Sequence, residues 1–479
     1  MIKPIMPAPS PTQTTESPAA GKVAARGGRG LLQILGVGFG LAVIIGNTIG
    51  AGIVRTSGEV AAQLPNVWVY LAVWVAGGLY ALLGAFSISE LSAMTPRSGG
   101  YYVFTRRALG EFPGFAVGWT DWLAQCGTTA AVSIVIGEYV DILLRRHLPQ
   151  HPELAGREVT TAIAVTVGMA LLQWHGIRWG SLIQNITSAA KALGFVALVA
   201  AIFLLVSPAG GTASAPLPGG VPLLVALVIA AQAVIYTYDG WYGAIYFGEE
   251  LRDPGRDAPR STIWGVFALM AIYLLVNLAL VYALPMTSIA GDKLALGSAA
   301  ATIFGEWTIT VVSALLILSM LAGINAYHLM ASRITFAMSR DGLLPRVVAR
   351  VNPGGTPTTA LLLSVAGAVG LTLLPLLRLG EKRPFEDVLA VTTFFFVTDY
   401  VLAYVAMFVL RWREPETPRP YRAWGYPWTT GLALAGSIAF LAGAIAGDTR
   451  NSVYALLVLA ASYPIYKLKR ALRSRAAGN

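Results

Sequence analysis

Cysteine and charge are both scarce in this chain of 479 residues. A single cysteine, Cys126, excludes an intrachain disulfide and a cysteine-based zinc site. The four histidines are scattered and form no spaced ligand pair, so we expect no metal. Charged residues make up only 12% of the chain, about half the share of an ordinary soluble domain. So few charges cannot cover the surface of a soluble protein this large, which excludes a cytosolic enzyme, a secreted domain and a disordered protein.

Signals for secretion and for nucleotide binding are also missing. Residues 1–30 are rich in Pro, Ala, Thr, Gly and Ser and predict a disordered tail. No apolar stretch precedes a cleavage site there, so we expect no signal peptide. The glycine-rich runs at 27–30 and 208–220 lack the Lys-Ser/Thr of a phosphate-binding loop. The sequence therefore gives no support to ATP-driven chemistry, and no cofactor is expected.

Long apolar runs dominate what is present. Hydrophobic residues make up 56% of the chain, and a helix needs about 20 apolar residues to cross a bilayer. The runs predict an all-α integral membrane protein with about twelve transmembrane helices, of which the last two are separated only by a short polar turn. The predicted spans are 31–56, 67–92, 114–144, 159–177, 182–206, 222–248, 261–284, 308–337, 358–377, 385–410, 427–447 and 452–468.

The positive charges follow the predicted topology. Twelve spans place both termini on one side, and with that side cytoplasmic the inner tails and loops hold 24 of the 34 Lys and Arg residues. The net charge of +10 is thus explained by membrane orientation, and we expect no nucleic-acid partner. Arginine outnumbers lysine 27 to 7, which is typical of a GC-rich bacterial genome. We expect a multi-pass protein of a bacterial inner membrane with both termini in the cytoplasm.

Two spans contain unusual interruptions. Gly46, Gly50 and Gly52 crowd the middle of the first, and the run Tyr-Asp-Gly-Trp-Tyr-Gly at 238–243 interrupts the sixth. Glycine-rich patches can serve close helix packing. Two breaks about 190 residues apart, each in the first helix of a five-helix half, instead indicate an inverted-repeat transporter with a site at the membrane midplane. The expected units are a tail at 1–30, the first repeat at 31–206, the second at 222–410, two further helices at 427–468, and a cytoplasmic tail at 469–479.

Three stretches carry a resemblance to a known family. They are Ile-Ile-Gly-Asn-Thr-Ile-Gly-Ala-Gly-Ile at 44–53, the stretch from Ser89-Glu90-Leu91 through Ser98-Gly99-Gly100-Tyr101 to Gly118-Trp119, and Tyr238-Asp239-Gly240-Trp241 with Glu249-Glu250 and Asp253-Pro254. Together they resemble the signatures of the amino acid–polyamine–organocation transporter superfamily. The Tyr-Asp-Gly-Trp form is similar to the L-amino-acid transporter branch, which includes bacterial serine/threonine exchangers.

The resemblance implies where a substrate binds. In this family, backbone N–H groups at the first-helix break bind a carboxylate. Carbonyls at the sixth-helix break bind an ammonium group, and an aromatic residue closes over the substrate. Serine is common where Ala51 stands, so one side-chain hydroxyl is missing here. By position, the expected substrate-binding residues are Asn47, Thr48, Gly50, Ala51 and Gly52 at the first break, Tyr236 (also the gate), Thr237 and Asp239 at the second, and Asn325 in the eighth span.

Several ionisable residues lie inside predicted spans. Lys191 resembles a family lysine that replaces a sodium ion and ties the fifth helix to the first, and we expect it to act as the coupling residue. Snorkelling to the inner interface is the alternative, although the distance along the helix makes that reach awkward. Asp239 has two possible roles: it caps the half-helix that follows, or it contacts a cationic amine. We expect Asp121, Glu138 and Asp141 at the membrane interface, and His328 packed or in contact with water. Asp399 could pair with a polar neighbour and has no assigned role.

These patterns favour one function and leave others open. The leading interpretation is a secondary transporter of L-amino acids, neutral ones above all, that works without sodium by exchange or proton coupling. An amine, polyamine or nucleobase permease of the same fold remains the alternative. A membrane enzyme lacks a visible nucleophile–base pair, and a channel lacks a repeated filter motif. The expected partners are a small amino-acid substrate and the lipid bilayer, and the sequence leaves the oligomeric state open.

Overall fold

The computed structural model describes residues 30–64, 66–154, 156–208, 222–377 and 384–477. Most of the tail predicted at 1–30 lies outside these residues. Within them the chain is nearly all helical. The helices are α1 (Val37–Thr48), α2 (Ala51–Gln63), α3 (Val67–Met94), α4 (Tyr101–Leu109), α5 (Glu111–His147), α6 (Glu158–Trp174), α7 (Ile177–Leu205), α8 (Leu223–Tyr238), α9 (Pro254–Ala283), α10 (Met286–Ile289), α11 (Ala295–Phe304), α12 (Thr308–Arg340), α13 (Thr358–Leu377), α14 (Pro384–Arg413), α15 (Trp428–Gly447) and α16 (Thr449–Ala477), with short 3-10 turns η1 (Pro152–Leu154), η2 (Gly243–Tyr246), η3 (Gly305–Trp307) and η4 (Arg346–Ala349).

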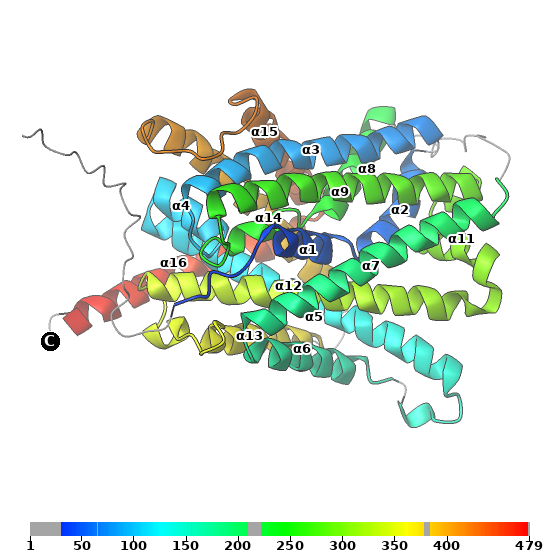
Figure 1. Cartoon of the computed structure of the whole chain (residues 1–479), viewed down its shortest axis with the longest axis horizontal. Helices are drawn as coiled ribbons and strands as arrows, with labels where there is room; N and C mark the ends of the chain where they lie inside the picture. The colour runs from blue at the N-terminus through cyan, green and yellow to red at the C-terminus, as the bar shows by residue number, and fades with distance from the viewer. Residues whose placement is uncertain (1–29, 65, 155, 209–221, 378–383, 478–479) are drawn as a thin grey trace, which may run out of the picture.

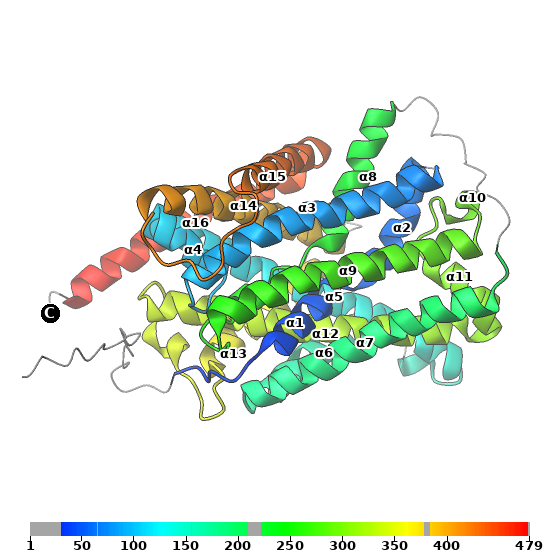
Figure 2. The ribbon, with the colours of Figure 1, turned by 45° about the horizontal axis from the view of Figure 1, so that its top comes forward.

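The prediction of an all-helical membrane protein is confirmed. Seven of the described helices are long and apolar enough to cross a bilayer, and α1 with α2 form an eighth, bent span. The other four predicted spans correspond to the shorter apolar helices α6, α8 and α13 and to α16. Most helices lie side by side along one axis, which is horizontal in Figure 1. The described chain starts and α16 ends toward the same end of this bundle, and α10 and α11 lie toward the other (Figure 2).

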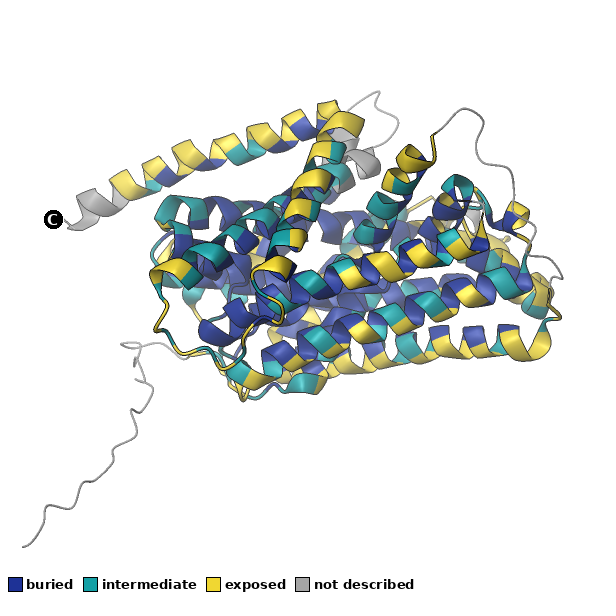
Figure 3. Cartoon of the chain, turned by 90° about the horizontal axis from the view of Figure 1, so that it is seen from above, coloured by how far each residue is buried: buried dark blue, intermediate teal, exposed yellow. Residues whose placement is uncertain are grey.

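The outer surface of the bundle suits lipid. Peripheral helices expose one face and bury the other (Figure 3). Large apolar side chains occupy the exposed faces, including Leu204 on α7, Leu224 on α8 and Trp428 on α15, each exposed by more than two thirds. A soluble monomer rarely exposes so much contiguous apolar surface, whereas in a bilayer it contacts acyl chains without penalty.

The helices of the two halves pack in corresponding pairs. The second span, α3, packs on the seventh, α9; the third, α5, packs on the eighth, α12; and the fourth, α6, packs on the ninth, α13. The first span meets the sixth in the same way, through α2 against α8 and α1 against η2. A two-fold axis between the halves brings each span next to its counterpart, so this pairing is what the inverted repeat requires.

Both predicted breaks are real. Helix α1 ends at Thr48 and α2 begins at Ala51 with a bend of 52°. Helix α8 ends at Tyr238, and only the short turn η2 follows, so the sixth span is not helical as far as residue 248. Gly240 lies between them with φ +106°, a conformation that L side chains rarely adopt. A Cβ at Gly240 would also clash with Asn47 and Thr48, so the two breaks touch.

A buried ion pair joins the second break to α12. Arg333 and Glu250 are both fully buried and form a bidentate pair, with Nε–Oε2 2.9 Å and Nη2–Oε1 2.8 Å. The guanidinium also lies 5.5 Å from the ring centre of Phe247. The neighbouring Glu249 pairs instead with Arg340, where both side chains are about a quarter exposed.

Replacing Glu250 should therefore destabilise the fold. Glu250→Gln leaves the Arg333 charge buried without its counter-ion, which costs about 3–5 kcal/mol in such pairs. We expect a clear fall in the thermal unfolding temperature of the purified protein in detergent. Glu249→Gln is the matched control, since a partly exposed pair contributes about 0–1 kcal/mol. Equal melting temperatures for the two variants would contradict this assignment.

Candidate functional site

A cavity of about 490 Å³ lies beside the two helix breaks. Segments far apart in the sequence line it: the α1–α2 break, the end of α8, and parts of α5, α12 and α14. Arg55 and Glu59 on α2 line it too and are exposed, so the cavity reaches solvent on the side of α10 and α11. Of the residues expected at the site, those that line the cavity are Asn47, Thr48, Gly50, Gly52, Tyr236, Thr237 and Asp239. The side chain of Ala51 lies outside the described part of the chain.

The N-terminus of α2 points its unpaired backbone groups at this cavity. Gly50 is the N-cap and provides no side-chain hydrogen bond, so the first N–H groups of α2 have no intrahelical acceptor. The helix dipole adds partial positive charge at the same place. A Cβ at Gly50 would meet nothing within 4 Å. The break therefore offers an open cradle for a carboxylate.

The C-terminus of α8 provides the opposite polarity. Its last carbonyls carry the negative end of the helix dipole. The Tyr273 hydroxyl lies 2.9 Å from the carbonyl oxygen of Thr237 and 2.9 Å from that of Thr48. Its hydrogen bonding to these carbonyls joins the two breaks. Asn47 completes the junction by donating through Nδ2 to the Gly240 carbonyl at 3.1 Å. A carbonyl can accept two hydrogen bonds, so the Thr237 carbonyl retains capacity for an ammonium group.

Asp239 does not cap the half-helix that follows it. The N-cap of η2 is Tyr242, without a side-chain capping bond, so the capping role, one of the two alternatives, is not observed. The Asp239 carboxylate instead accepts a hydrogen bond from the Tyr400 hydroxyl on α14. Asp239 thus ties the second break to α14 and lines the cavity at the same time.

Lys191 lies fully buried on α7, behind the first break. Its ammonium group donates to three carbonyls: Gly46 at 2.9 Å, Ser319 at 3.0 Å, and Ile49. These bonds use all three of its donors. Lys191 therefore does not snorkel to the interface, and it ties α7 and α12 to the carbonyls freed where α1 ends.

Comparison with known proteins now identifies the family. A sequence model of amino acid permeases matches residues 39–463. The chain belongs to the amino acid permease family. The resemblance seen in the sequence motifs is thereby confirmed, and the permease is a membrane transporter rather than an enzyme.

Its relatives are similar over most of their length. The serine/threonine exchanger SteT of Bacillus subtilis is 27% identical over 448 residues, which cover 91% of this chain and 97% of SteT. The mouse large neutral amino acids transporter small subunit 2 is 28% identical over 424 residues. The matched region covers 85% of this chain and 75% of the mouse protein. The mouse Asc-type amino acid transporter 1 is also 28% identical, over a region that covers 82% of this chain and 73% of the mouse protein.

Asn325 does not line the cavity of the permease. It is fully buried on α12, where its amide nitrogen donates to the Gly180 carbonyl at 3.0 Å and to Gln184 Oε1 at 2.7 Å. Its own oxygen accepts from Gln173 Nε2 at 2.8 Å. The side chain is thus fully used in joining α12 to α6 and α7, next to the site rather than in it.

Other lining residues gave no signal in the sequence. Thr128 on α5, Tyr327 on α12 and Phe396 on α14 all line the cavity but stand in ordinary apolar runs. The Thr48 and Thr128 hydroxyls are buried without a partner among the described residues, so they are available to a ligand. Only the helix packing, which the sequence does not reveal, brings these positions together.

The interfacial placement expected for Asp121 was wrong. Asp121 is fully buried on α5, and its carboxylate accepts hydrogen bonds from Tyr246 and Gln125. Helix α5 begins at Glu111 and is 37 residues long, so Asp121 lies well inside it. Glu138 and Asp141 do lie toward its far end, and Asp141 pairs there with Arg145 at 2.7 Å.

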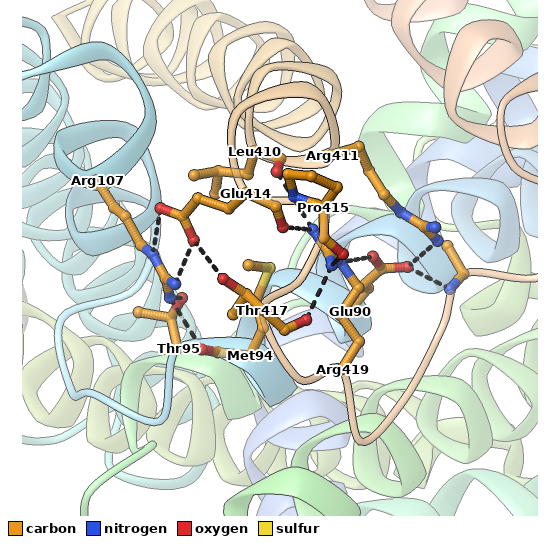
Figure 4. Close-up of polar contacts among 11 residues, drawn as sticks. Glu90, Met94, Thr95, Arg107, Leu410, Arg411, Glu414, Pro415, Thr417 and Arg419 are labelled. Carbon is orange, nitrogen blue, oxygen red and sulfur yellow. Dashed lines mark hydrogen bonds and ion pairs between the residues drawn. The ribbon is translucent and has the colours of Figure 1, made fainter.

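The end of the bundle opposite the cavity mouth is closed by ion pairs. We call it the arginine-rich end, after Arg97, Arg106, Arg107, Arg340, Arg411 and Arg419. Buried Glu90 on α3 pairs there with Arg411 at 2.7 Å and Arg419 at 3.0 Å (Figure 4). Arg107 on α4 pairs with Glu414 just after α14, and this hydrogen bond holds the pKa of Glu414 below its usual range.

Further contacts close the same end around α1 and α12. Asp341, after α12, pairs with Arg97 at 2.8 Å and with Arg106 at 2.6 Å. The chain before α1 is held to the segment after η2, because Leu35 N donates to the Glu250 carbonyl and Arg252 N donates to the Leu35 carbonyl, both at 2.8 Å. Among the described residues, the cavity thus reaches solvent beside Arg55 and Glu59, and these contacts close the opposite end.

Gly50→Leu should abolish substrate binding without unfolding the permease. The new Cβ enters open space, and the leucine side chain then covers the N–H groups of α2. We expect no ligand-induced thermal shift and a near wild-type melting temperature. Gly46→Leu is the contrasting variant, since its Cβ would clash with Gln184 and Ser188 and should lower stability itself. Normal amino-acid binding by the Gly50 variant would remove the α2 N-terminus from the site.

Proposed function

We propose that this permease moves neutral L-amino acids across the membrane by alternating access, without sodium. One observation carries the proposal: the N-terminus of α2 and the C-terminus of α8 meet at one cavity. An α-amino acid carries a carboxylate and an ammonium group on one carbon, which matches these two opposite helix ends. In this proposal Gly50, Ala51 and Gly52 bind the carboxylate through backbone N–H groups, and the carbonyls of Tyr236, Thr237 and Asp239 face the ammonium group.

The rest of the cavity favours a side chain without charge. Its walls on α5 and α14 carry Thr128, Val132 and Phe396, which are apolar or hydroxyl-bearing. Arg55 and Glu59 introduce opposite charges at the exposed mouth and together favour neither sign. Among its relatives are a serine/threonine exchanger and a transporter of large neutral amino acids, which supports the same substrate class.

The family match favours this cargo over the alternative. A polyamine or other amine lacks the carboxylate that the α2 terminus is suited to bind, and a nucleobase lacks both groups. Asp239 is the acidic residue at the second break, and its bond to Tyr400 reduces its capacity for a cationic amine.

We also propose the orientation of the protein. The arginine-rich end is cytoplasmic by the positive-inside rule, which places the described start of the chain and the end of α16 in the cytoplasm of a bacterial cell. The cavity then opens outward and the ion pairs close the inner side. The repeats at 31–206 and 222–410, followed by the helices at 427–468, form the moving units of alternating access.

Uptake into proteoliposomes tests the proposal directly. Purified permease is reconstituted with unlabelled amino acid inside and radiolabelled amino acid outside. We expect exchange of neutral amino acids and none of putrescine or uracil. Transport of putrescine or uracil in place of amino acids would overturn the assignment.

Transport should not require sodium. The Lys191 ammonium already provides a fixed positive charge beside the first break. A second cation about 4 Å away would be repelled by about 4 kcal/mol at an effective dielectric constant of 20. Replacing sodium with potassium or choline should leave uptake unchanged.

Lys191→Ala should slow transport but keep measurable binding, because the link from α7 to α1 loosens while the α2 cradle stays. A strict sodium requirement, or normal transport by this variant, would contradict the role of Lys191.

Tyr236→Ala should weaken occlusion more than folding. Tyr236 lines the cavity at the end of α8, where its ring can cover a bound substrate. Without the ring we expect faster leak of trapped substrate and poorer exchange, measured as efflux with and without external amino acid. Tyr236→Phe keeps the ring and is the control. Unchanged kinetics for the alanine variant would exclude a gate at this position.

A further inference from the structure

Two carboxylates lie together in the core of the permease, away from the substrate cavity. Asp121 on α5 and Asp399 on α14 are both fully buried, and the two helices pack against each other. The hydroxyl of Thr120, the residue before Asp121, lies 3.5 Å from Asp399 Oδ1, so the two acidic residues occupy the same buried region. Neither residue lines the cavity.

Only neutral groups donate to this pair. Asp121 accepts from the Tyr246 hydroxyl at 2.9 Å and from Gln125 Nε2 at 3.0 Å. Within the described parts of the chain, Asp399 has only the long contact with Thr120, and its Oδ2 has no partner. Across the described residues, neither carboxylate forms an ion pair with a lysine, arginine or histidine. The Gln125 amide oxygen is also buried without a partner beside Asp121.

These surroundings predict one negative charge rather than two. Two ionised carboxylates in a buried site repel each other strongly, so such pairs hold a proton. Asp121 receives the hydrogen bonds that stabilise an ionised carboxylate, whereas Asp399 receives almost none. The proton therefore belongs on Asp399. A metal ion fits poorly, because the donors of Tyr246 and Gln125 already point at Asp121, and the described residues include no group of three or more His, Cys, Asp or Glu side chains that could hold one.

The pair is connected to the moving parts of the transporter. Tyr246, which donates to Asp121, is the last residue of η2, directly after the second break. Tyr400, which follows Asp399 in the sequence, donates to Asp239 in that break. A shift of η2 relative to α5 would separate Tyr246 from Asp121 and admit water to the pair. Loss of the Tyr246 bond alone strengthens the hold of Asp121 on a proton, so release requires that the admitted water solvates the second negative charge.

Tyrosine rings fill the space between the pair and the cavity. Tyr242 packs against Tyr101 with ring centres 5.2 Å apart and against Tyr400 at 5.6 Å, and Tyr101 packs against Tyr246 at 6.2 Å. The Tyr101 hydroxyl is buried without a partner in the described structure. At the two sides of this ring cluster, the Tyr400 hydroxyl donates to Asp239 and the Tyr246 hydroxyl donates to Asp121.

We propose that Asp121 and Asp399 bind one proton between them and release it when η2 moves, so that this pair couples proton movement to amino-acid transport. The proposal rests on the proposed transport function. On release, the O–H bond of Asp399 breaks, its electron pair stays on the carboxylate, and the proton passes to water admitted by the movement. Rebinding a proton restores the single negative charge.

The other titratable groups nearby do not provide a counter-charge. Facing the pair are Tyr101 on α4, Tyr242 and Tyr246 at η2, and Asp239 at the end of α8. Helix α12 contributes Tyr327 near Tyr242, and its buried His328 bonds to neither carboxylate. On α5 itself, Cys126 is bonded to the Ser364 carbonyl of α13, and Glu111 is bonded to Tyr466 of α16.

Asp399→Asn tests the proposal, because it imitates the protonated residue permanently. The measurements are amino-acid exchange in proteoliposomes and proton flux, followed with a pH-sensitive dye trapped inside. The wild type should couple an amino-acid gradient to proton movement. The variant should lose that proton flux and the pH dependence of net uptake, while exchange and ligand-induced thermal stabilisation persist. Asp141→Asn is the control, since this carboxylate lies at the far end of α5, the helix that carries Asp121, and the variant should retain both activities.

Infrared spectroscopy provides a readout that needs no transport. The wild type should show the carbonyl band of a protonated carboxylic acid, shifted in heavy water, and Asp399→Asn should lack it. Absence of the band from the wild type, or proton flux retained by Asp399→Asn, would overturn the proposal. Failure of the wild type to bind or exchange amino acids would instead overturn the proposed function, and the infrared band would still decide whether the pair holds a proton.

Discussion

The whole site depends on how the permease satisfies the backbone where two membrane helices stop. A backbone group left unpaired inside a bilayer is costly, so a break persists only where other protein groups replace the lost helical bonds. Here the two breaks partly satisfy each other. Asn47 bonds to Gly240, and the Tyr273 hydroxyl joins the carbonyls of Thr48 and Thr237. At the start of α2, in the part of the chain that the structure describes, no side chain caps the helix, and Gly50 and Gly52 line the cavity there.

Lys191 extends the same principle from hydrogen bonding to charge. The carbonyls freed at the end of α1 concentrate negative partial charge at one point in the membrane. The Lys191 ammonium group compensates it through three bonds, and Ser319 adds a hydroxyl bond to the Ile49 carbonyl at 2.8 Å. The cost of burying a lysine in a membrane is thus offset at a place where the backbone needs a cation. This arrangement also fixes α7 and α12 to the first break, so a movement of α1 must involve both.

The fold and the helix breaks could be predicted from the sequence because both depend on patterns of neighbouring residues. Apolar runs of membrane length predict spans, and glycines crowded inside such runs predict unwinding. The same reliance on local pattern made the predicted position of Asp121 wrong. Its place near the start of an apolar run suggested the membrane interface, but α5 begins at Glu111, near the arginine-rich end, and Asp121 lies in the core. The partners of Asp239 and Asn325 could not be predicted either, since Tyr400 and Gln184 are 161 and 141 residues away and meet them only through packing. Thr128 looked like any residue of an apolar span.

Charge is distributed very differently at the two ends of the cavity, and this difference suggests how the protein can change state. At the arginine-rich end, Glu90 and Asp341 each pair with two arginines and Glu414 pairs with Arg107, so opening that end requires several ion pairs to separate together. Pairs that are partly exposed contribute little individually, because water can replace each partner. Buried pairs such as Arg333 with Glu250 resist separation far more. The partly exposed pairs, such as Arg107 with Glu414 and Arg340 with Glu249, can therefore open and close during transport more readily than the buried pairs of Glu90 with Arg419 and of Glu250 with Arg333.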